Sequence, residues 1–217
     1  MSETDSFIEE VSEEVRRDQL FKLFRKWGWL PALIIILVVG GAAFNEYRKA
    51  TQQAEAERIG DALLTALALP SEARLAAVEG VTSDDAGTRA VIGLVTAAAA
   101  ADGEDVAAAD AALAAMAADP STPELYRDLA SFKRLTLNDS PMTRNDRIAT
   151  IDALSRPGGP FRALATEQRG ILLIEDGDVD GAMAIFRDLA QDAEATPSQI
   201  QRIRQLMIVL GGDPNDG

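Results

Sequence analysis

The sequence predicts an all-α protein in which one membrane-spanning helix is followed by an array of helical hairpins. Three observations lead to this prediction. Residues 27–45 contain no charged side chain and are strongly apolar from Trp29 to Phe44. Beyond them, apolar residues recur at helical spacing between breaks marked by Gly and Pro. No segment shows the alternation typical of a β-strand.

Residues 27–45 (WGWLPALIIILVVGGAAFN) have the length of a transmembrane helix. Nineteen residues at about 1.5 Å each span roughly 28 Å, close to the ~30 Å hydrocarbon core of a bilayer. A buried core helix is the alternative, but one of this length should carry a polar face. The expected anchor residues, which include aromatic rings suited to the headgroup level, are Trp27, Trp29, Leu33, Ile34, Ile35, Ile36, Leu37, Val38, Val39 and Phe44.

The charges that flank this span predict its orientation. The cations close before it are Arg16, Arg17, Lys22, Arg25 and Lys26, and those in the first fifteen residues after it are Arg48, Lys49 and Arg58. The positive-inside rule then keeps the N-terminus in the cytoplasm and sends residues 46–217 across the membrane. A signal peptide cleaved near the small residues Gly41 to Ala43 is the alternative. The long acidic segment before the span favours an uncleaved anchor.

Composition limits the chemistry of residues 46–217. They carry 16 basic and 28 acidic side chains, a net charge of −12 that would repel nucleic acid and anionic lipid. The chain has no cysteine and no histidine, which removes thiolate nucleophiles, the usual general base and the commonest transition-metal ligand. We therefore expect no nucleic-acid partner, no small-molecule substrate, no cofactor, no metal and no enzymatic activity.

The segments on either side of the span are expected to be helical. Residues 1–26 open with Ser6 and Glu9 in a capping-box pattern and continue with apolar residues at helical spacing. We interpret them as a cytoplasmic amphipathic arm at the membrane interface, and a docking site for a cytoplasmic partner is the alternative. Residues 46–58 are polar and helix-prone, and are predicted to be a helical stalk that continues the span.

Residues 59–210 are predicted to form about three helical hairpins closed by a last helix, with 211–217 as a disordered tail. The pattern becomes amphipathic at Ile59, and Pro70 ends that first helix. The further helices expected are 71–81, an Ala-rich pair around Gly103, 123–137, 144–154, a pair around Gly177, and 197–210. Residues 97–118 contain fourteen alanines, so the Ala-rich hairpin should contribute least to the core.

Two of these hairpins fit the 34-residue tetratricopeptide pattern, in which small residues let antiparallel helices touch and Gly or Pro ends each helix. In the Ala-rich hairpin the matching residues are Gly103, Ala108, Ala115 and Pro120. In the last hairpin they are Gly170, Leu173, Gly177, Ala182 and Phe186. The sequence therefore predicts a tetratricopeptide-like α-solenoid.

Acidic motifs in this region have alternative interpretations as metal or catalytic sites. The run from Asp176 to Gly181 matches the first half of an EF-hand loop, but Arg187 occupies the twelfth position, where a bidentate glutamate is needed. The turn of a helical hairpin explains the same residues. The pairs Asp84-Asp85, Glu104-Asp105 and Glu175-Asp176 fall at predicted helix starts or turns, without the apolar pocket that a catalytic pair needs.

The order of these parts resembles the YfgM family, the ancillary subunit of the Sec translocon. The resemblance is carried by EVRRDQLFKLFRKWG before the span, NEYRKATQQAEAERIGDAL after it and FRALATEQRGILLIEDGDVDGAMAIF in the last hairpin. It covers nearly the whole chain, which departs from the family in its Ala-rich first repeat and longer middle loop. It implies a bacterial inner-membrane protein that associates with the translocon and a periplasmic folding factor, and it implies no catalytic residues.

We therefore expect a non-enzymatic adaptor whose hairpins bind peptides or partner proteins at the periplasmic face of the membrane. The resemblance implies the Sec translocon and periplasmic folding factors as partners. An accessory or assembly factor for another membrane complex, such as a respiratory one, would use the same architecture. An enzyme acting on the cell wall or on peptides is disfavoured by the absence of His and Cys.

Overall fold

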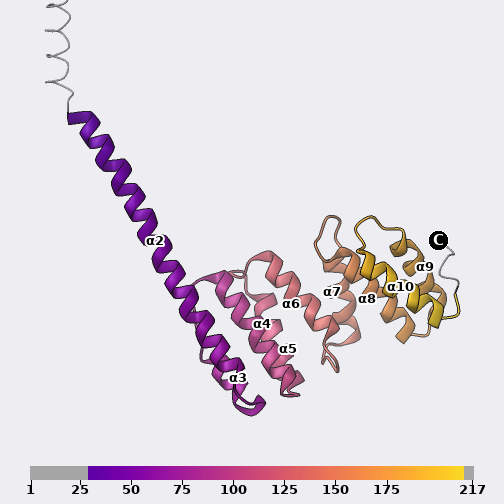
Figure 1. Ribbon diagram of the computed structural model, residues 1–217. Helices are drawn as coiled ribbons and strands as arrows, with labels where there is room; N and C mark the ends of the chain where they lie inside the picture. The colour runs from indigo at the N-terminus through magenta and orange to yellow at the C-terminus, as the bar shows by residue number, and fades with distance from the viewer. Residues whose placement is uncertain (1–28, 213–217) are drawn as a thin grey trace, which may run out of the picture. The chain divides into compact units, whose positions relative to one another are not determined.

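The computed structural model describes residues 29–212, which form nine helices and no strand in that range (Figure 1). The helices are α2 (Trp29–Leu67), α3 (Ser71–Glu79), α4 (Ala86–Asp102), α5 (Val106–Ala118), α6 (Glu124–Thr136), α7 (Arg144–Leu154), α8 (Arg162–Glu175), α9 (Val179–Ala190) and α10 (Pro197–Val209). For these residues the all-α prediction is confirmed. The predicted arm 1–26, Trp27 of the predicted span and residues 213–217 of the predicted tail lie outside the described range.

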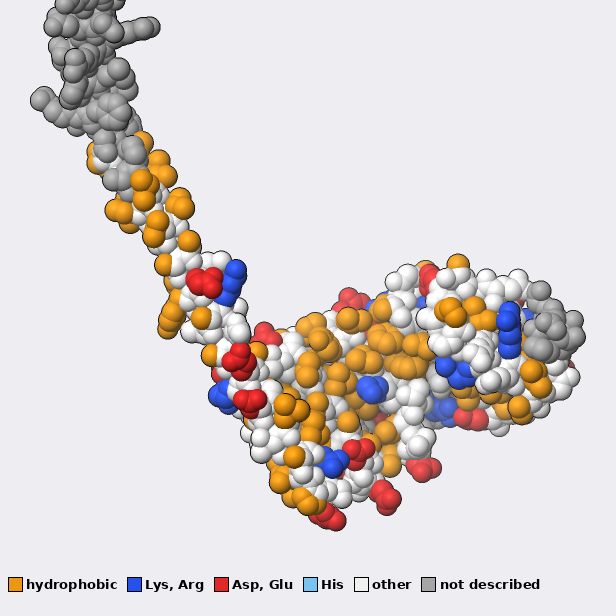
Figure 2. All heavy atoms as spheres, in the orientation of Figure 1, with side chains coloured by type: hydrophobic (Ala, Val, Ile, Leu, Met, Phe, Trp, Pro, Cys, Tyr) orange, Lys and Arg blue, Asp and Glu red, His pale blue; other side chains and the backbone are white. Residues whose placement is uncertain are grey.

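Helix α2 joins three predicted segments in one element of 39 residues: most of the span, the stalk and the first helix of the hairpin domain. The chain divides into two compact units, one ending at Glu57 and the other beginning at Arg58. In the first unit, Trp29, Phe44 and the run from Leu33 to Val39 are exposed, and Figure 2 shows these apolar side chains along α2. Within residues 29–212, no helix combines the length and apolar character needed to cross a membrane.

In the second unit, every helix from α3 to α10 packs against the next one along the chain. Helices α4 and α5, α6 and α7, and α8 and α9 form the three expected hairpins, and α10 closes the array by packing on α9. The largest fully buried side chains are Phe186, Ile151, Leu189, Ile203, Met207 and Val78. None of them comes from the Ala-rich residues 97–118, where the large buried side chains are Leu113 and Met116.

Side chains at the helix starts explain why the elements begin where they do. Five helices begin after a residue whose side chain accepts a hydrogen bond from the first turn: Asp85, Asp105, Thr143, Asp178 and Thr196. Pro70 and Pro123 precede α3 and α6. These are strong local signals, which is why the four helices predicted with bounds agree with the structure to within two residues.

The end of α10 differs from the prediction. Gly211 and Gly212, expected in a disordered tail, instead terminate this helix. Gly211 has φ +84°, and the Gly212 N–H donates to the Met207 carbonyl (2.9 Å), which is the hydrogen bond of a glycine-terminated helix. A Cβ on Gly212 would lie 2.1 Å from Cε of Met183, so the end of α10 is closely packed against α9.

Candidate functional site

The predicted signature residues of the last hairpin meet where α8 and α9 pack together. A Cβ on Gly170 would lie 2.4 Å from Cε1 of Phe186, so only glycine lets the ring approach α8 this closely. Ala182 and Phe186 are fully buried, and Leu173 packs against their cluster. Gly177 has φ +81° in the turn between the helices, a conformation that favours glycine.

In the Ala-rich hairpin the predicted register is wrong by one residue. Ala109, not Ala108, is fully buried, and Ala115 is exposed. Gly103 ends α4 with φ −85°, whereas Glu104 takes the left-handed conformation with φ +62°. Pro120 is exposed in the loop after α5. A run of identical small side chains gives little pattern by which to choose the buried face, and this explains the error.

With this correction, the two hairpins match at positions 73 residues apart. The Asp105 N–H donates to the Ala100 carbonyl, and the Asp178 N–H donates to the Leu173 carbonyl, both at 2.9 Å. The match covers three helices in each copy of the repeat. Helices α4, α5 and α6 form the first copy, and α8, α9 and α10 form the second. Positions buried in both copies are Ala90 and Ala163, Ala109 and Ala182, Leu113 and Phe186, Met116 and Leu189, and Ala130 and Ile203.

An arginine at the start of each copy holds the loop that follows its second helix. Arg89 donates to Ser121 Oγ (3.1 Å), and Arg162 donates to Glu194 Oε2 (2.6 Å) and to both oxygens of Asp192 (2.7 Å). Hydrogen bonds to Asp192, then to Glu194, raise the pKa of Arg162. These contacts fix the loops that lead into α6 and α10.

The middle hairpin borders an open groove of about 330 Å³ where it meets the loop before α8. The groove is lined by Glu124, Leu125, Asp128, Arg156, Pro157, Gly158, Gly159 and Pro160. Pro123 starts α6 immediately before Glu124, and Arg156 follows the end of α7. The groove is therefore built from the two ends of one hairpin and the connection to the next.

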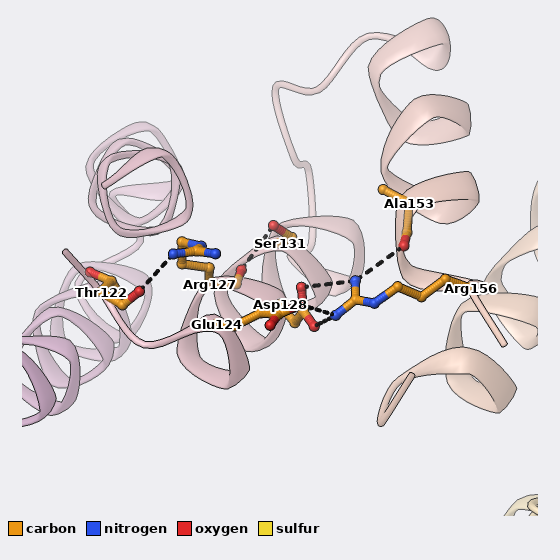
Figure 3. Close-up of polar contacts among 7 residues, drawn as sticks. All are labelled: Thr122, Glu124, Arg127, Asp128, Ser131, Ala153 and Arg156. Carbon is orange, nitrogen blue, oxygen red and sulfur yellow. Dashed lines mark hydrogen bonds and ion pairs between the residues drawn. The ribbon is translucent and has the colours of Figure 1, made fainter. Parts of the chain in front are cut away.

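Arg156 joins the two sides of this groove by ionic hydrogen bonds (Figure 3). Its Nη2 donates to Glu124 Oε1 (2.9 Å) and to Asp128 Oδ2, and its Nη1 donates to Asp128 Oδ1 (3.4 Å) and to the Ala153 carbonyl (3.3 Å). Asp128, and to a lesser extent Glu124, raise the pKa of Arg156. Two carboxylates share one guanidinium, so the ionic cluster carries one excess negative charge.

The rest of the lining is apolar or backbone. Leu125 lies in the first turn of α6 and is 56% exposed. Pro157 and Pro160 flank two glycines, of which Gly158 has φ +71°. A Cβ on Gly159 would lie 3.0 Å from the Arg156 carbonyl, which accepts the Gly159 N–H at 3.0 Å. This loop therefore forms a tight turn that presents its backbone to the groove.

A second arginine fixes the start of α6 from the other side. Nη1 of Arg127 donates to the carbonyls of Thr122 (2.9 Å) and Pro120 (3.3 Å). Figure 3 shows Arg127 reaching toward Thr122, while Glu124 and Asp128 meet Arg156 on the opposite side of α6. The contacts of Arg127 with the preceding loop and the ionic cluster of the groove therefore lie on opposite sides of α6.

Five of the acidic residues singled out in the sequence have structural partners among the described residues. The Asp178 carboxylate accepts the Gly181 N–H (2.9 Å) at the start of α9, and Asp85 and Asp105 cap α4 and α5 in the same way. Glu175 and Asp176 lie at the end of α8, where the helix dipole disfavours carboxylates, and they pair with Arg147 and Arg144. No group of three potential ligands able to hold a metal ion occurs among residues 29–212.

Sequence reasoning did not identify the groove. Two weak signals were available: a leucine between the two carboxylates at the start of a helix, and glycines enclosed by prolines. The pairing of Arg156 with side chains 28 and 32 residues earlier follows from the hairpin geometry, which no local pattern encodes.

Comparison with known proteins agrees with this architecture. The model of a family described as "Tetratricopeptide repeat-like domain" matches residues 21–206. This range contains the entire groove. No curated protein and no solved structure gives a significant match.

Proposed function

Because the chain belongs to the tetratricopeptide repeat-like domain family, we propose that it is a non-enzymatic adaptor that binds other proteins through its helical array. Stacked hairpins of this kind provide binding surfaces without catalytic groups. The observation that carries the proposal is the groove between α6 and the loop before α8. It combines an exposed leucine, two prolines and an ionic cluster, which is the mixture of apolar and polar groups typical of protein-binding surfaces.

The adaptor is proposed to be tethered to the bacterial inner membrane by residues 27–45, with the hairpins in the periplasm. Two features support the tether. The segment has no charged residue, and its bulky apolar side chains from Leu33 to Phe44 are exposed along α2. Exposed apolar side chains in such number on a single helix need a partner that excludes water, and a bilayer is such a partner.

The proposed partners are the Sec translocon and periplasmic folding factors, which follow from the resemblance to the YfgM family. The alternative is an accessory or assembly factor of another inner-membrane complex, such as a respiratory complex. Tethering would favour either role, because it raises the effective concentration of the groove near membrane partners.

Site-specific crosslinking in native membranes tests this proposal. A photoreactive amino acid replaces Leu125 at the groove in the full-length chain. The matched control places it at Ile208 of α10, which is equally exposed (55%) but outside the groove. We expect position 125 to crosslink to translocon subunits or a folding factor, and position 208 not to do so.

Crosslinks from position 125 to respiratory subunits without translocon subunits would favour the alternative partner complex. The absence of protein crosslinks at Leu125 and at other exposed positions of the array would contradict the adaptor function itself.

A further inference from the structure

The loop side of the groove offers free hydrogen-bond acceptors beside the ionic cluster. Pro157 and Pro160 have no N–H, and the Gly159 N–H is bonded to the Arg156 carbonyl. The carbonyls of Pro157 and Gly158 accept no hydrogen bond from any described residue. Together with the carboxylate oxygens of Glu124 and Asp128, these carbonyls can accept hydrogen bonds from the N–H groups of a ligand cation.

Glu124 is the carboxylate available to such a group. Its side chain is 68% exposed, whereas that of Asp128 is 14% exposed. If Glu124 turned toward a ligand, Arg156 would keep its two hydrogen bonds to Asp128 and the one to the Ala153 carbonyl. The ionic cluster therefore tolerates a second cation without leaving Arg156 unpaired.

The apolar part of the lining lies beside this carboxylate. Leu125 follows Glu124 directly in the chain, and Pro157 and Pro160 border the same groove. About 330 Å³ is at the lower end of the roughly 300–1,000 Å³ typical of ligand pockets. The opening thus suits one or two side chains of an extended segment better than a folded surface.

We propose that the groove binds an extended segment of a partner protein in which an apolar residue stands next to a lysine or arginine. The apolar side chain packs on Leu125 and the two prolines, and the cation pairs with Glu124 while donating to the loop carbonyls. Lys and Arg carry donors only, and the net charge of −12 on residues 46–217 attracts basic segments over a longer range. This inference rests on the proposed adaptor function and adds the chemistry of the partner.

An array of immobilised peptides tests the chemistry. Each peptide has a Gly-Ser background with one central pair: Leu-Lys, Leu-Arg, Leu-Glu, Leu-Ser or Ser-Lys. The full-length chain is applied in mild detergent at low salt, because exposed ion pairs are screened by salt. We expect Leu-Lys and Leu-Arg to retain about threefold more protein than Leu-Glu or Ser-Lys. A ratio of this size corresponds to the binding free energy contributed by one exposed ion pair or one partly buried leucine.

Three variants assign the effect to the groove. Glu124→Gln should abolish the preference for Leu-Lys over Leu-Glu, and Leu125→Ser should weaken every leucine peptide. Glu104→Gln removes an exposed carboxylate outside the groove and should leave the preference unchanged. Glu124→Gln is nearly isosteric at an exposed site, so loss of the fold will not produce its effect.

Equal retention of Leu-Lys and Leu-Glu peptides, or an unchanged preference in Glu124→Gln, would overturn the proposed chemistry. If crosslinks from Leu125 still reached a membrane complex, the adaptor function would stand without it. Dimers that Leu125→Ser abolishes would also overturn the proposal, because a second copy of this chain would then occupy the groove.

Discussion

At Gly170 the absence of a side chain lets the ring of Phe186 contact the backbone of α8. Gly170→Ala would place Cβ 2.4 Å from Cε1 of a fully buried ring, so Phe186 must shift within a closed core. We expect the free energy of unfolding to fall by about 1–2 kcal/mol, since overpacking outweighs the better helix propensity of alanine. Chemical unfolding of the full-length chain in mild detergent measures the change.

Gly60→Ala is the matched control. Gly60 lies inside α2, and a Cβ added to it would meet no atom within 4 Å. The same substitution should there raise the free energy of unfolding by about 0.5–1 kcal/mol, because alanine favours a helix. A Gly170→Ala protein as stable as Gly60→Ala would contradict the close contact between α8 and α9.

Asp192 makes stability depend on pH. Its pKa lies below the ordinary value, first because Arg162 hydrogen-bonds to the carboxylate and next because the Glu194 N–H does. A group with a lowered folded pKa stabilises the fold above its unfolded pKa of about 3.9 and loses that contribution as pH falls through the folded value. Asp192→Asn should therefore lower the urea midpoint at pH 7, and the difference from wild type should shrink below about pH 4.

The control for this experiment is Asp188→Asn, which removes the same charge from an exposed position on α9 that forms no ion pair with any described residue. It should leave the pH dependence close to that of wild type. A difference between Asp192→Asn and wild type that grows on acidification would contradict the role of the Arg162 pair.

At the scale of helices, a partly buried ionic contact joins α8 to α10. Arg202 donates to both oxygens of Glu167 (2.6 and 2.7 Å), and Gln199 donates to the same carboxylate (3.0 Å). Glu167 is almost completely buried. Leu94 and Leu129 occupy the corresponding positions 73 residues earlier, so the other copy of the repeat has an apolar pair where this one has an ion pair.

This comparison predicts that the effects of Arg202→Leu and Glu167→Leu on the free energy of unfolding are not additive. Arg202→Leu alone leaves the Glu167 carboxylate buried without its cation and should cost about 2–3 kcal/mol, less than the roughly 3–5 kcal/mol of a fully buried pair because Arg202 is half exposed. Adding Glu167→Leu recreates the pair of the first copy and should restore most of the loss. A double variant that is less stable than Arg202→Leu would show that the two copies are not interchangeable here.

The helices were the most predictable part of the fold. Asp, Thr and Pro at helix starts are local signals, and the contact of Gly170 with Phe186 follows from a side-chain pattern within one hairpin. The register of the Ala-rich hairpin was not predictable, because Ala108, Ala109 and Ala115 are identical side chains and differ only in burial. The groove was not predictable either, since it depends on how Arg156 meets α6 after the hairpin has closed.

At the scale of the molecule, the repeat explains how the array is closed at α10. Helix α6 covers α7 with Phe132 and the buried Leu135. The corresponding residues of α10 are Gln205 and Ile208, and both are exposed. One face of α10 thus packs on α9 through Ile203 and Met207, while the opposite face is mostly polar, as terminal units of stacked repeats require.

The charges that flank residues 27–45 predict how the chain is oriented in the membrane. Five cations stand before residues 27–45 and three follow closely, while residues 46–217 carry a net charge of −12; the cation imbalance favours a cytoplasmic N-terminus. A reporter that is active only outside the cytoplasm should therefore be active when fused after Gly217 and inactive when fused before Met1. The reverse pattern would contradict the proposed orientation and place the groove beyond reach of periplasmic partners. A mature chain beginning near Phe44 would instead show that residues 27–45 act as a cleaved signal. The hairpins would then bind their partners without being tethered to the membrane.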